Sequence, residues 1–253
     1  CLEAILETYT GNRETPEFQE FLVYAKRVFF SNGIHHHYAE EKILPSCSAD
    51  YMKQLLENSD VHADRDSMVE IMCNPGLYKM RKSMGREGDL LLTSSTNFYD
   101  GVSRTQAEEF YAAMEDTSDR RPVEYGLNSR LVWKEGAVIE ETYKADGLYG
   151  PAIQQICHWL EKAAGVAESP EQASYIKTLI DYYQTGDLAL WDAFNVAWVQ
   201  DTDTFVDFIN GFIEYYGDPL GRKGSWEGNV NYMDTEASRR TTIISQNAQW
   251  FED

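Results

Sequence analysis

Apolar residues recur every three or four positions along most of this chain, the spacing that places them on one face of a helix. The first clear case is residues 16–31, where Pro16 stands at a favourable first helical position. A second helix is predicted from residue 148 to Gly165, a residue type that commonly ends helices. Five more are predicted after capping residues, which are Ser48, Ser103, Ser169, Asp187 and Asp234. The pattern predicts a mainly helical protein with at least seven helices.

One further helix is predicted over residues 204–217. Its apolar stripe consists of Phe205, Phe208, Ile209, Phe212 and Ile213. On a helix, Asp207, Asn210 and Glu214 would share the opposite face, because they are three and four positions apart. Two carboxylates and an amide can hold an ammonium group through charge-assisted hydrogen bonds. The pattern alone favours a simpler interpretation, in which these are solvated polar positions.

Only residues 127–144 argue for strands. Two stretches rich in β-branched and aromatic residues flank Lys134, Glu135 and Gly136, a short turn with glycine available for a positive φ. A lone hairpin is marginal in water, so a larger sheet or helices are expected to support it. The glycine-rich residues 82–101 are predicted to be a loop. The expected fold class is mainly α, of the α+β type: a multi-helical lobe with a β-hairpin or a partial small β-barrel.

Composition and charge limit the kinds of molecule that the chain can be expected to bind. The chain has 253 residues, of which 43% are hydrophobic, so a substantial core is expected. A formal net charge of −20 repels nucleic acid and anionic membrane surfaces. No apolar run approaches the roughly 20 residues of a membrane span, and no basic and apolar leader opens the chain. The four cysteines are irregularly spaced and form no C-x-x-C, which favours a reduced, cytoplasm-like setting.

Standard catalytic motifs are absent: the sequence has no H-E-x-x-H, G-x-S-x-G, Walker glycine loop or G-x-G-x-x-G. The histidine run His35–His37, close to Glu40 and Glu41, offers ligand types that zinc accepts. However, adjacent side chains diverge on a helix and alternate on a strand, so at most two of the three histidines converge easily on one ion. A structural role in a turn after the first amphipathic helix is the favoured interpretation. His62 and His158 stand alone and are given no role.

Several segments resemble the dipeptidyl peptidase III family of zinc exopeptidases, particularly its Bacteroides-type bacterial members. They are RVFFSNGIHHHYAEEKILP, GLNSRL, GLYGPAIQQICHWLEKAAG and residues 198–228. The most specific is F-I-E-x-Y-x-D-P-x-G-x-x-G-x-x-E, which runs from Phe212 to Glu227. The family's zinc motif, His-Glu-x-x-Gly-His with a further Glu, lies C-terminal to the matching region and does not occur here. The resemblance therefore implies a fragment that lacks the zinc-binding half.

In this family two lobes enclose a substrate cleft, and residues 1–253 are expected to form a single helical, substrate-binding lobe without metal. The implied activity of the full-length enzyme is zinc-dependent removal of dipeptides from the free N-termini of oligopeptides. The fragment itself is expected to hold no zinc, to be inactive alone and to pair with the missing catalytic lobe. The resemblance assigns binding of the substrate's N-terminal ammonium to Asp207. Ile209 replaces a tyrosine of characterised relatives, and Asn210 is a candidate to compensate.

Two other interpretations remain open at this stage. The chain can be a stand-alone acidic helical module that binds peptides or proteins without catalysis. Alternatively, His35–His37 bind a metal and the chain has hydrolytic activity of its own. A downstream His-Glu-x-x-Gly-His motif would distinguish the first from the peptidase, and equilibrium dialysis with zinc would test the second.

Overall fold

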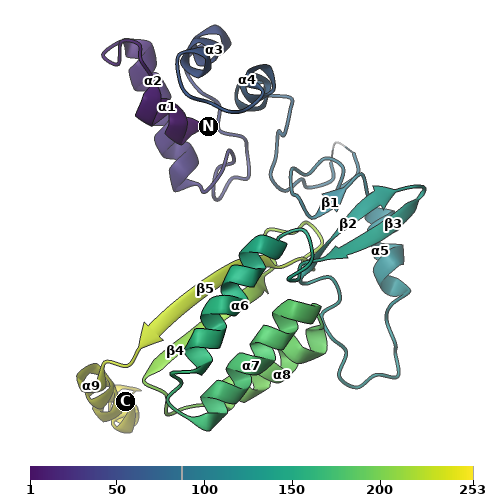
Figure 1. The fold of residues 1–253 in the computed structure, drawn as a ribbon, viewed down its shortest axis with the longest axis vertical. Coiled ribbons are helices and arrows are strands. Elements are labelled where there is room, and N and C mark those ends of the chain that lie inside the picture. Colours follow the sequence, from purple (N-terminus) through teal and green to yellow (C-terminus); the bar gives the residue numbers. More distant parts are fainter. Residues whose placement is uncertain (87, 253) are drawn as a thin grey trace. The chain divides into compact units, whose positions relative to one another are not determined.

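The computed structural model describes residues 1–86 and 88–252 (Figure 1). The chain divides into two compact units, Cys1–Thr105 and Gln106–Asp253. The first unit contains four helices and one short strand: α1 (Leu2–Thr8), α2 (Pro16–Phe30), α3 (Ala49–Glu57), α4 (Arg65–Cys73) and β1 (Tyr99–Asp100). Helix α5 (Arg104–Ala112) begins at the boundary. The predicted helices at residues 16–31 and after Ser48 are confirmed as α2 and α3, whereas α4 was not predicted.

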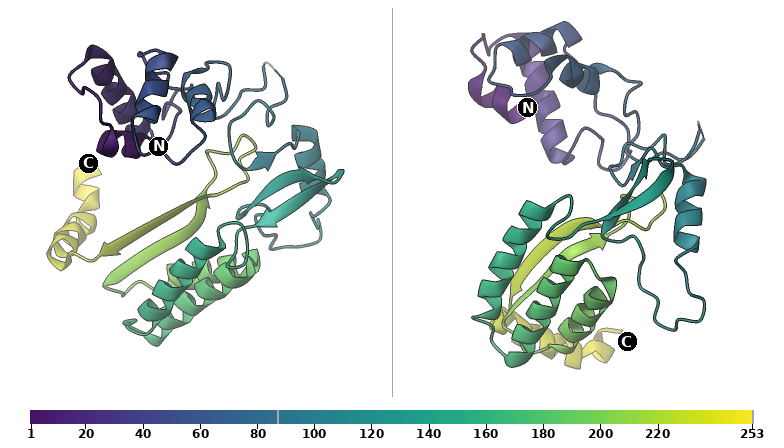
Figure 2. Two further views of the ribbon diagram at one scale, coloured as in Figure 1. Left: turned by 45° about the horizontal axis from the view of Figure 1, so that its top comes forward. Right: turned by 45° about the vertical axis from the view of Figure 1, so that its right-hand side comes forward.

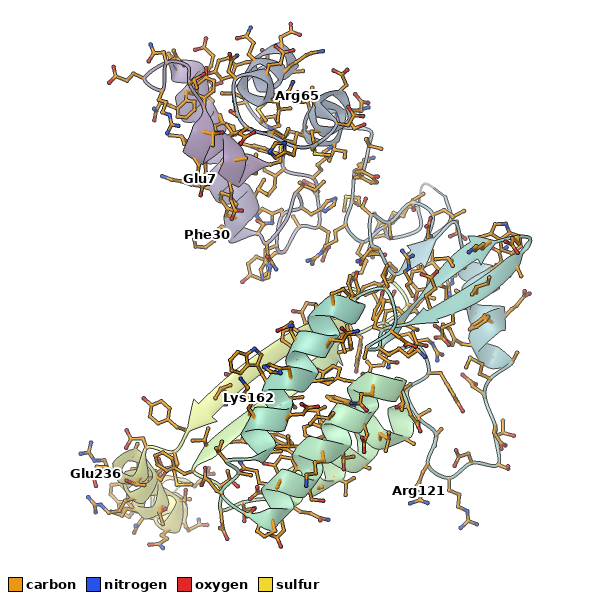
Figure 3. The ribbon with its side chains drawn as sticks, viewed as in Figure 1. Glu7, Phe30, Arg65, Arg121, Lys162 and Glu236 are labelled. Atoms are coloured by element: carbon orange, nitrogen blue, oxygen red, sulfur yellow. The ribbon has the colours of Figure 1, made fainter. Side chains whose placement is uncertain are left out.

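The helices of the first unit start as their sequences indicate. Thr15 directly precedes Pro16, the first residue of α2. Its hydroxyl caps the helix by accepting a hydrogen bond from the Phe18 backbone N–H. Ser48 caps α3 in the same way. The apolar faces of these helices meet in one core cluster, which includes Ile5, Phe18, Phe21, Tyr24, Met52, Leu55, Leu56 and Met72. Phe30 lies at the end of α2, outside this core, and is 94% exposed (Figure 3).

The second unit combines helices with two antiparallel hairpins. Its remaining elements are β2 (Ser129–Lys134), β3 (Ala137–Thr142), α6 (Gly150–Ala164), α7 (Pro170–Thr185), α8 (Leu188–Gln200), β4 (Val206–Glu214), β5 (Ser225–Tyr232), α9 (Thr235–Gln246) and α10 (Ala248–Glu252). Helices α6, α7 and α8 lie side by side along the β4–β5 hairpin (Figures 1 and 2). Their shared core includes Leu160, Tyr175, Leu179, Tyr183, Trp191, Phe194 and Phe212.

The capping signals of the second unit are confirmed. Ser169 accepts from the Gln172 amide at the start of α7, and Gly186 ends this helix in a left-handed conformation with φ +77°. The Asp187 and Asp234 carboxylates cap α8 and α9. The helices after Ser103 and up to Gly165 are also present, as α5 and α6. The helix predicted after Asp234 was expected to run to residue 250, and the structure divides it at Asn247 into α9 and α10.

The predicted hairpin is confirmed as β2–β3. Trp133 pairs with Val138 and Lys134 with Ala137, which leaves Glu135 and Gly136 as a two-residue turn. Both turn residues have positive φ, 53° and 83°, as a type I′ turn requires. In the described residues the two small sheets do not close into a barrel. The α+β fold class is therefore confirmed with open sheets.

The predicted helix over residues 204–217 is wrong, because this segment forms β4. Strand β4 pairs antiparallel with β5, so that Phe208 lies opposite Val230 and Phe212 opposite Trp226. A register shift between Phe212 and Glu214 marks a bulge. Gly211 explains how closely β4 approaches α8, since a Cβ atom at this position would lie 2.4 Å from the Trp191 ring. Tertiary packing on α7 and α8 has overridden the helical spacing of the apolar residues.

Two further features bear on the sequence predictions. None of the described helices is both long enough and apolar enough to cross a membrane. The four cysteines are free thiols, of which Cys47 and Cys157 are buried. Burial raises the pKa of Cys47 to about 11, which disfavours its reactive thiolate form.

Candidate functional site

An apolar groove of about 590 Å³ runs between α6 and the β4–β5 hairpin. Two tryptophans mark it: Trp159 of α6 is 63% exposed, and Trp226 of β5 is 46% exposed. The Lys162 ammonium lies 4.4 Å from the centre of the Trp159 ring, a cation–π contact. Ile209 and Asn210 of β4 also line the groove. Exposed aromatic walls with few polar groups are typical of a ligand-binding groove.

Asn210 is held in place by a chain of hydrogen bonds. The Trp226 indole N–H donates to the Tyr183 hydroxyl (2.9 Å), which in turn donates to Oδ1 of Asn210 (2.7 Å). Tyr183 is fully buried, and burial raises its pKa, so the hydroxyl keeps its proton. An amide oxygen has two lone pairs, so Oδ1 retains one for a further donor. The chain of bonds fixes one polar acceptor on the wall of an apolar groove.

Asp207 is partly buried and is oriented by α8. Its Oδ1 accepts from the Trp198 indole N–H (2.8 Å) and from the Phe208 backbone N–H (2.8 Å). None of the hydrogen bonds recorded for the described residues uses Oδ2. Because Oδ1 is held in place, Oδ2 can accept charge-assisted hydrogen bonds from a cationic ligand.

The structure changes the predicted relation between Asp207, Asn210 and Glu214. The prediction that they share one helical face is wrong, because all three lie on strand β4. Residues three positions apart on a strand point to opposite faces. In the structure Asp207 accepts a hydrogen bond from Trp198 of α8, Asn210 accepts one from Tyr183 of α7, and Glu214 is exposed at the end of the strand. Asn210 lines the groove and Asp207 does not.

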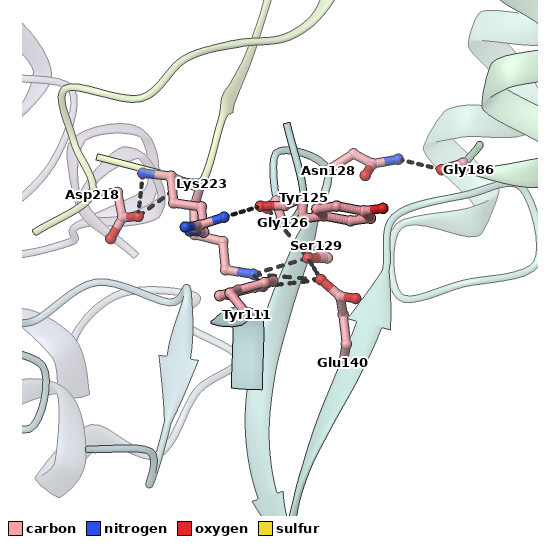
Figure 4. Close-up of polar contacts among 10 residues, drawn as sticks. Tyr111, Tyr125, Gly126, Asn128, Ser129, Glu140, Gly186, Asp218 and Lys223 are labelled. Atoms are coloured by element: carbon pink, nitrogen blue, oxygen red, sulfur yellow. Dashed lines mark hydrogen bonds and ion pairs between the residues drawn. The ribbon is translucent and has the colours of Figure 1, made fainter. Parts of the chain in front are cut away.

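A buried polar cluster in the second unit was not predicted from the sequence (Figure 4). At its centre, Lys223 is completely buried and donates from Nζ to the hydroxyls of Tyr111 and Ser129. Glu140 completes the cluster: its Oε1 accepts from both hydroxyls and lies 3.9 Å from the Lys223 ammonium. The four side chains come from α5, β2, β3 and the β4–β5 loop, so the cluster ties these elements together.

The Asp-Pro-x-Gly-x-x-Gly part of the sequence motif builds this cluster. The Asp218 carboxylate accepts from the backbone N–H groups of Leu220, Arg222 and Lys223, which folds the loop and turns Lys223 inward (Figure 4). Burial lowers the pKa of Lys223 to about 8, although Glu140 and Asp218 oppose the shift. The motif thus has a structural role, which the resemblance alone did not reveal.

The histidine run forms a turn with structural hydrogen bonds. His35 is buried, and its Nε2 lies 2.8 Å from the Tyr78 carbonyl oxygen. Nδ1 of His36 accepts from the backbone N–H groups of Tyr38 and Ala39. Glu40 is engaged elsewhere, in a two-pronged ion pair with Arg81 that lowers its pKa. These contacts use one ring nitrogen each of His35 and His36 and the carboxylate of Glu40.

Within residues 1–86 and 88–252, no group of three or more His, Cys, Asp or Glu side chains is placed to hold a metal ion. The sequence also lacks the His-Glu-x-x-Gly-His motif. The described residues therefore do not fit the zinc ion that the resemblance implies.

Residues 123–251, just over half of the chain, match the model of Peptidase family M49, and the chain belongs to this family. It is similar to dipeptidyl peptidase 3 of Homo sapiens (22% identity over 92% of the chain) and of Dictyostelium discoideum (22% identity over 93%). The chain spans 36% of the length of each relative. The solved structure of DPP III from Caldithrix abyssi covers 97% of the chain with a TM-score of 0.50 and 14% identity, while 42% of that structure is covered. This last likeness supports the fold.

Proposed function

We propose that this chain is the substrate-binding lobe, without metal, of a zinc-dependent dipeptidyl aminopeptidase that removes dipeptides from the free N-termini of oligopeptides. Membership of Peptidase family M49 carries this proposal, because the matched residues 123–251 include β4, β5 and the groove beside them. On this proposal residues 1–253 act together as one lobe. The missing catalytic lobe of the same protein is its partner.

The role proposed for Asp207 is to pair with the N-terminal ammonium of the substrate. Trp198 and the Phe208 amide hold Oδ1, so the carboxylate pays little conformational entropy on binding. An ammonium fixed at one point determines which peptide bond reaches the catalytic groups, and this sets the cut two residues from the end. A free N-terminus is thereby distinguished from a blocked one.

The groove is proposed to receive an apolar side chain of the bound peptide. Ile209 contributes an apolar surface at a position where characterised members of the dipeptidyl peptidase III family have a tyrosine. Asn210 contributes one fixed hydrogen-bond acceptor. Trp159 and Trp226 offer broad aromatic contact. Because residues 1–86 and 88–252 offer no ligand set for zinc, the chain is expected to be inactive alone.

In the complete peptidase, Asp207→Ala is expected to raise KM for dipeptide-naphthylamide substrates by roughly ten-fold or more, because a charge-assisted contact to the ammonium is lost. That contact exists in the ground state and in the transition state alike, so kcat is expected to change little. Steady-state kinetics of the wild type and the variant measure both constants.

Asp181→Ala is the matched control, since it removes an exposed carboxylate from α7 outside the groove. It is expected to leave KM unchanged. Unaltered KM in Asp207→Ala, or an equal rise in both variants, would contradict the role of Asp207.

A further inference from the structure

The groove between α6 and the β4–β5 hairpin has walls without charge. Of the described residues that line it, none is acidic or basic, although the chain as a whole carries a net charge of −20. The polar side chains of the groove are three carboxamides, those of Gln155, Asn210 and Asn229. Because a charged group is costly to place against apolar surface without a partner of opposite charge, the groove favours an uncharged ligand.

The three carboxamides are suited to a peptide backbone. A carboxamide and a peptide unit both offer a carbonyl acceptor and an N–H donor, so that each can satisfy the other. Gln155 and Asn229 are exposed, and none of the hydrogen bonds recorded for the described residues uses their side chains. These two groups are therefore able to pair with the C=O and N–H groups of a peptide.

Asn210 is the carboxamide whose orientation is fixed. The Tyr183 hydroxyl donates to its Oδ1 (2.7 Å), which leaves Nδ2 on the other side of the amide group. Among the hydrogen bonds recorded for the described residues, none uses Nδ2. Since Asn210 lines the groove, its N–H donors are available to a carbonyl oxygen of a bound peptide.

The apolar walls leave room for a large, flat side chain. Trp159 and Trp226 both line the groove, and aromatic side chains bury a large area in contact with one another. Gly228 lies opposite Asn210 in the pairing of β4 with β5. A Cβ atom at Gly228 would lie 3.1 Å from the Trp226 ring and 3.3 Å from Cβ of Asn210. The absence of a side chain at Gly228 therefore keeps this part of the groove open.

We propose that the groove binds the substrate peptide through a bulky, uncharged side chain, above all an aromatic one, while the Asn210 amide donates to a carbonyl oxygen of the peptide backbone. This inference rests on the proposed peptidase function and adds the class of side chain that the enzyme selects. It is separate from the role proposed for Asp207, which does not line the groove.

Isothermal titration of the 253-residue chain with N-acetylated tripeptide amides tests the proposal. These probes have no terminal ammonium, so their binding does not depend on the contact proposed for Asp207. Acetyl-Ala-Phe-Ala amide is expected to bind roughly ten-fold or more tightly than acetyl-Ala-Ala-Ala amide, because burial of the ring stabilises the complex. Peptides with Glu or Lys at the central position are expected to bind no more tightly than the Ala peptide.

Two tryptophan variants locate the aromatic contact. Trp159→Ala removes one wall of the groove and is expected to weaken binding of the Phe peptide by roughly five- to ten-fold. Trp133→Ala is the matched control, because it removes a half-exposed tryptophan of β2 that does not line the groove. This control is expected to bind the Phe peptide as the wild type does.

Asn210→Asp tests the amide donor. The variant keeps the oxygen that accepts from Tyr183 and removes only the N–H groups. It is expected to weaken binding of the Phe and Ala peptides alike, by roughly five- to ten-fold, so that the preference for Phe remains. A collapse of the groove would instead remove this preference.

Gly228→Ala tests the width of the groove. It is expected to reduce the preference for the Phe peptide, because the added methyl group crowds the Trp226 ring. Gly217→Ala is the matched control in the β4–β5 loop, since a Cβ atom there would meet only Ser225 Oγ, at an ordinary 3.8 Å. It is expected to keep the preference of the wild type.

Several results would overturn the proposal. They are absence of saturable binding by the Phe peptide, equal affinity for the Phe and Ala peptides, tighter binding of the Glu or Lys peptide than of the Phe peptide, and full affinity in Trp159→Ala. Unchanged affinity in Asn210→Asp would overturn the contact proposed for Asn210. A comparison of free and blocked N-termini tests the role of Asp207 separately, so failure of that role with a preserved preference for Phe would leave the selectivity of the groove standing.

Discussion

Replacement of Lys223 by alanine is expected to lower the free energy of unfolding by about 3–5 kcal/mol, because the polar groups around its buried ammonium would be left without that positive charge. Glu140 would keep its negative charge in a largely buried position without the ammonium 3.9 Å away. The hydroxyls of Tyr111 and Ser129 would lose a donor, and the deleted methylenes would leave a cavity. Urea unfolding followed by circular dichroism measures the change.

Two further variants test whether the loss of stability comes from the buried ion pair. Lys177→Ala removes an exposed lysine from α7 and is expected to alter stability by no more than about 0.5 kcal/mol. The double variant Lys223→Met/Glu140→Gln removes both charges, and it is expected to recover a large part of the lost stability. A loss below about 1 kcal/mol in Lys223→Ala would show that the cluster contributes little to the fold.

Unfolding at alkaline pH is the second large effect that we expect. Burial raises the pKa of four tyrosines in the second unit well above their ordinary value of 10.0; these are Tyr111, Tyr143, Tyr182 and Tyr183. Above pH 10 the unfolded chain releases phenol protons that the folded chain retains, so stability falls as pH rises. Each tyrosine contributes about 1.4 kcal/mol per pH unit, and the four together roughly 5 kcal/mol per pH unit.

Lys223 has the opposite effect at lower pH. Its pKa in the folded chain is about 8, against an ordinary value of 10.5, so between these values the folded chain binds fewer protons and stability rises with pH. We therefore expect maximum stability between about pH 8 and 10, followed by cooperative unfolding. Urea midpoints across this range, with the absorbance of tyrosinate followed in parallel, measure both effects.

The variant Tyr182→Phe isolates the contribution of one tyrosine to the loss of stability at alkaline pH. The Tyr182 hydroxyl has no hydrogen-bond partner within residues 1–86 and 88–252, so this variant removes an ionisable group with little loss of bonding. The alkaline slope is expected to decrease by about 1.4 kcal/mol per pH unit. If all tyrosines ionised near pH 10 while the helical signal persisted, the burial argument would be wrong.

Much of the helical framework is predictable because its signals are local. A capping side chain and a following amphipathic stretch lie within a few residues of each other, as at Ser169 for α7 and Asp187 for α8. The β2–β3 hairpin is local as well, since Glu135 and Gly136 determine the turn. Helix α4 was missed, although Asp64 caps it, because its apolar face is short.

Strand β4 was mispredicted for an identifiable reason. Its apolar residues fit a helical spacing, and short apolar runs cannot be assigned by periodicity alone. Gly211 in the middle of the segment disfavours a helix, and this was the available signal. The resemblance pointed to Asp207 independently of the secondary structure, so its role in binding stays a prediction, whereas the helical face expected for it is wrong.

The Lys223 cluster could not be predicted from sequence patterns. Lys223 and Tyr111 are 112 positions apart, and only the folded chain brings them together. In the sequence each is one polar residue in a helix or loop, without any spacing that indicates its partners.

The most direct test of the central claim is the affinity of the 253-residue chain for a tetrapeptide with a free N-terminus and for the same peptide with an acetylated N-terminus. We expect the free peptide to bind at least about ten-fold more tightly, because only it carries the ammonium that Asp207 would hold. We also expect Asp207→Asn to abolish this preference. Equal affinity for both peptides would contradict the role proposed for Asp207 and would favour a peptide-binding module that does not distinguish the N-terminus.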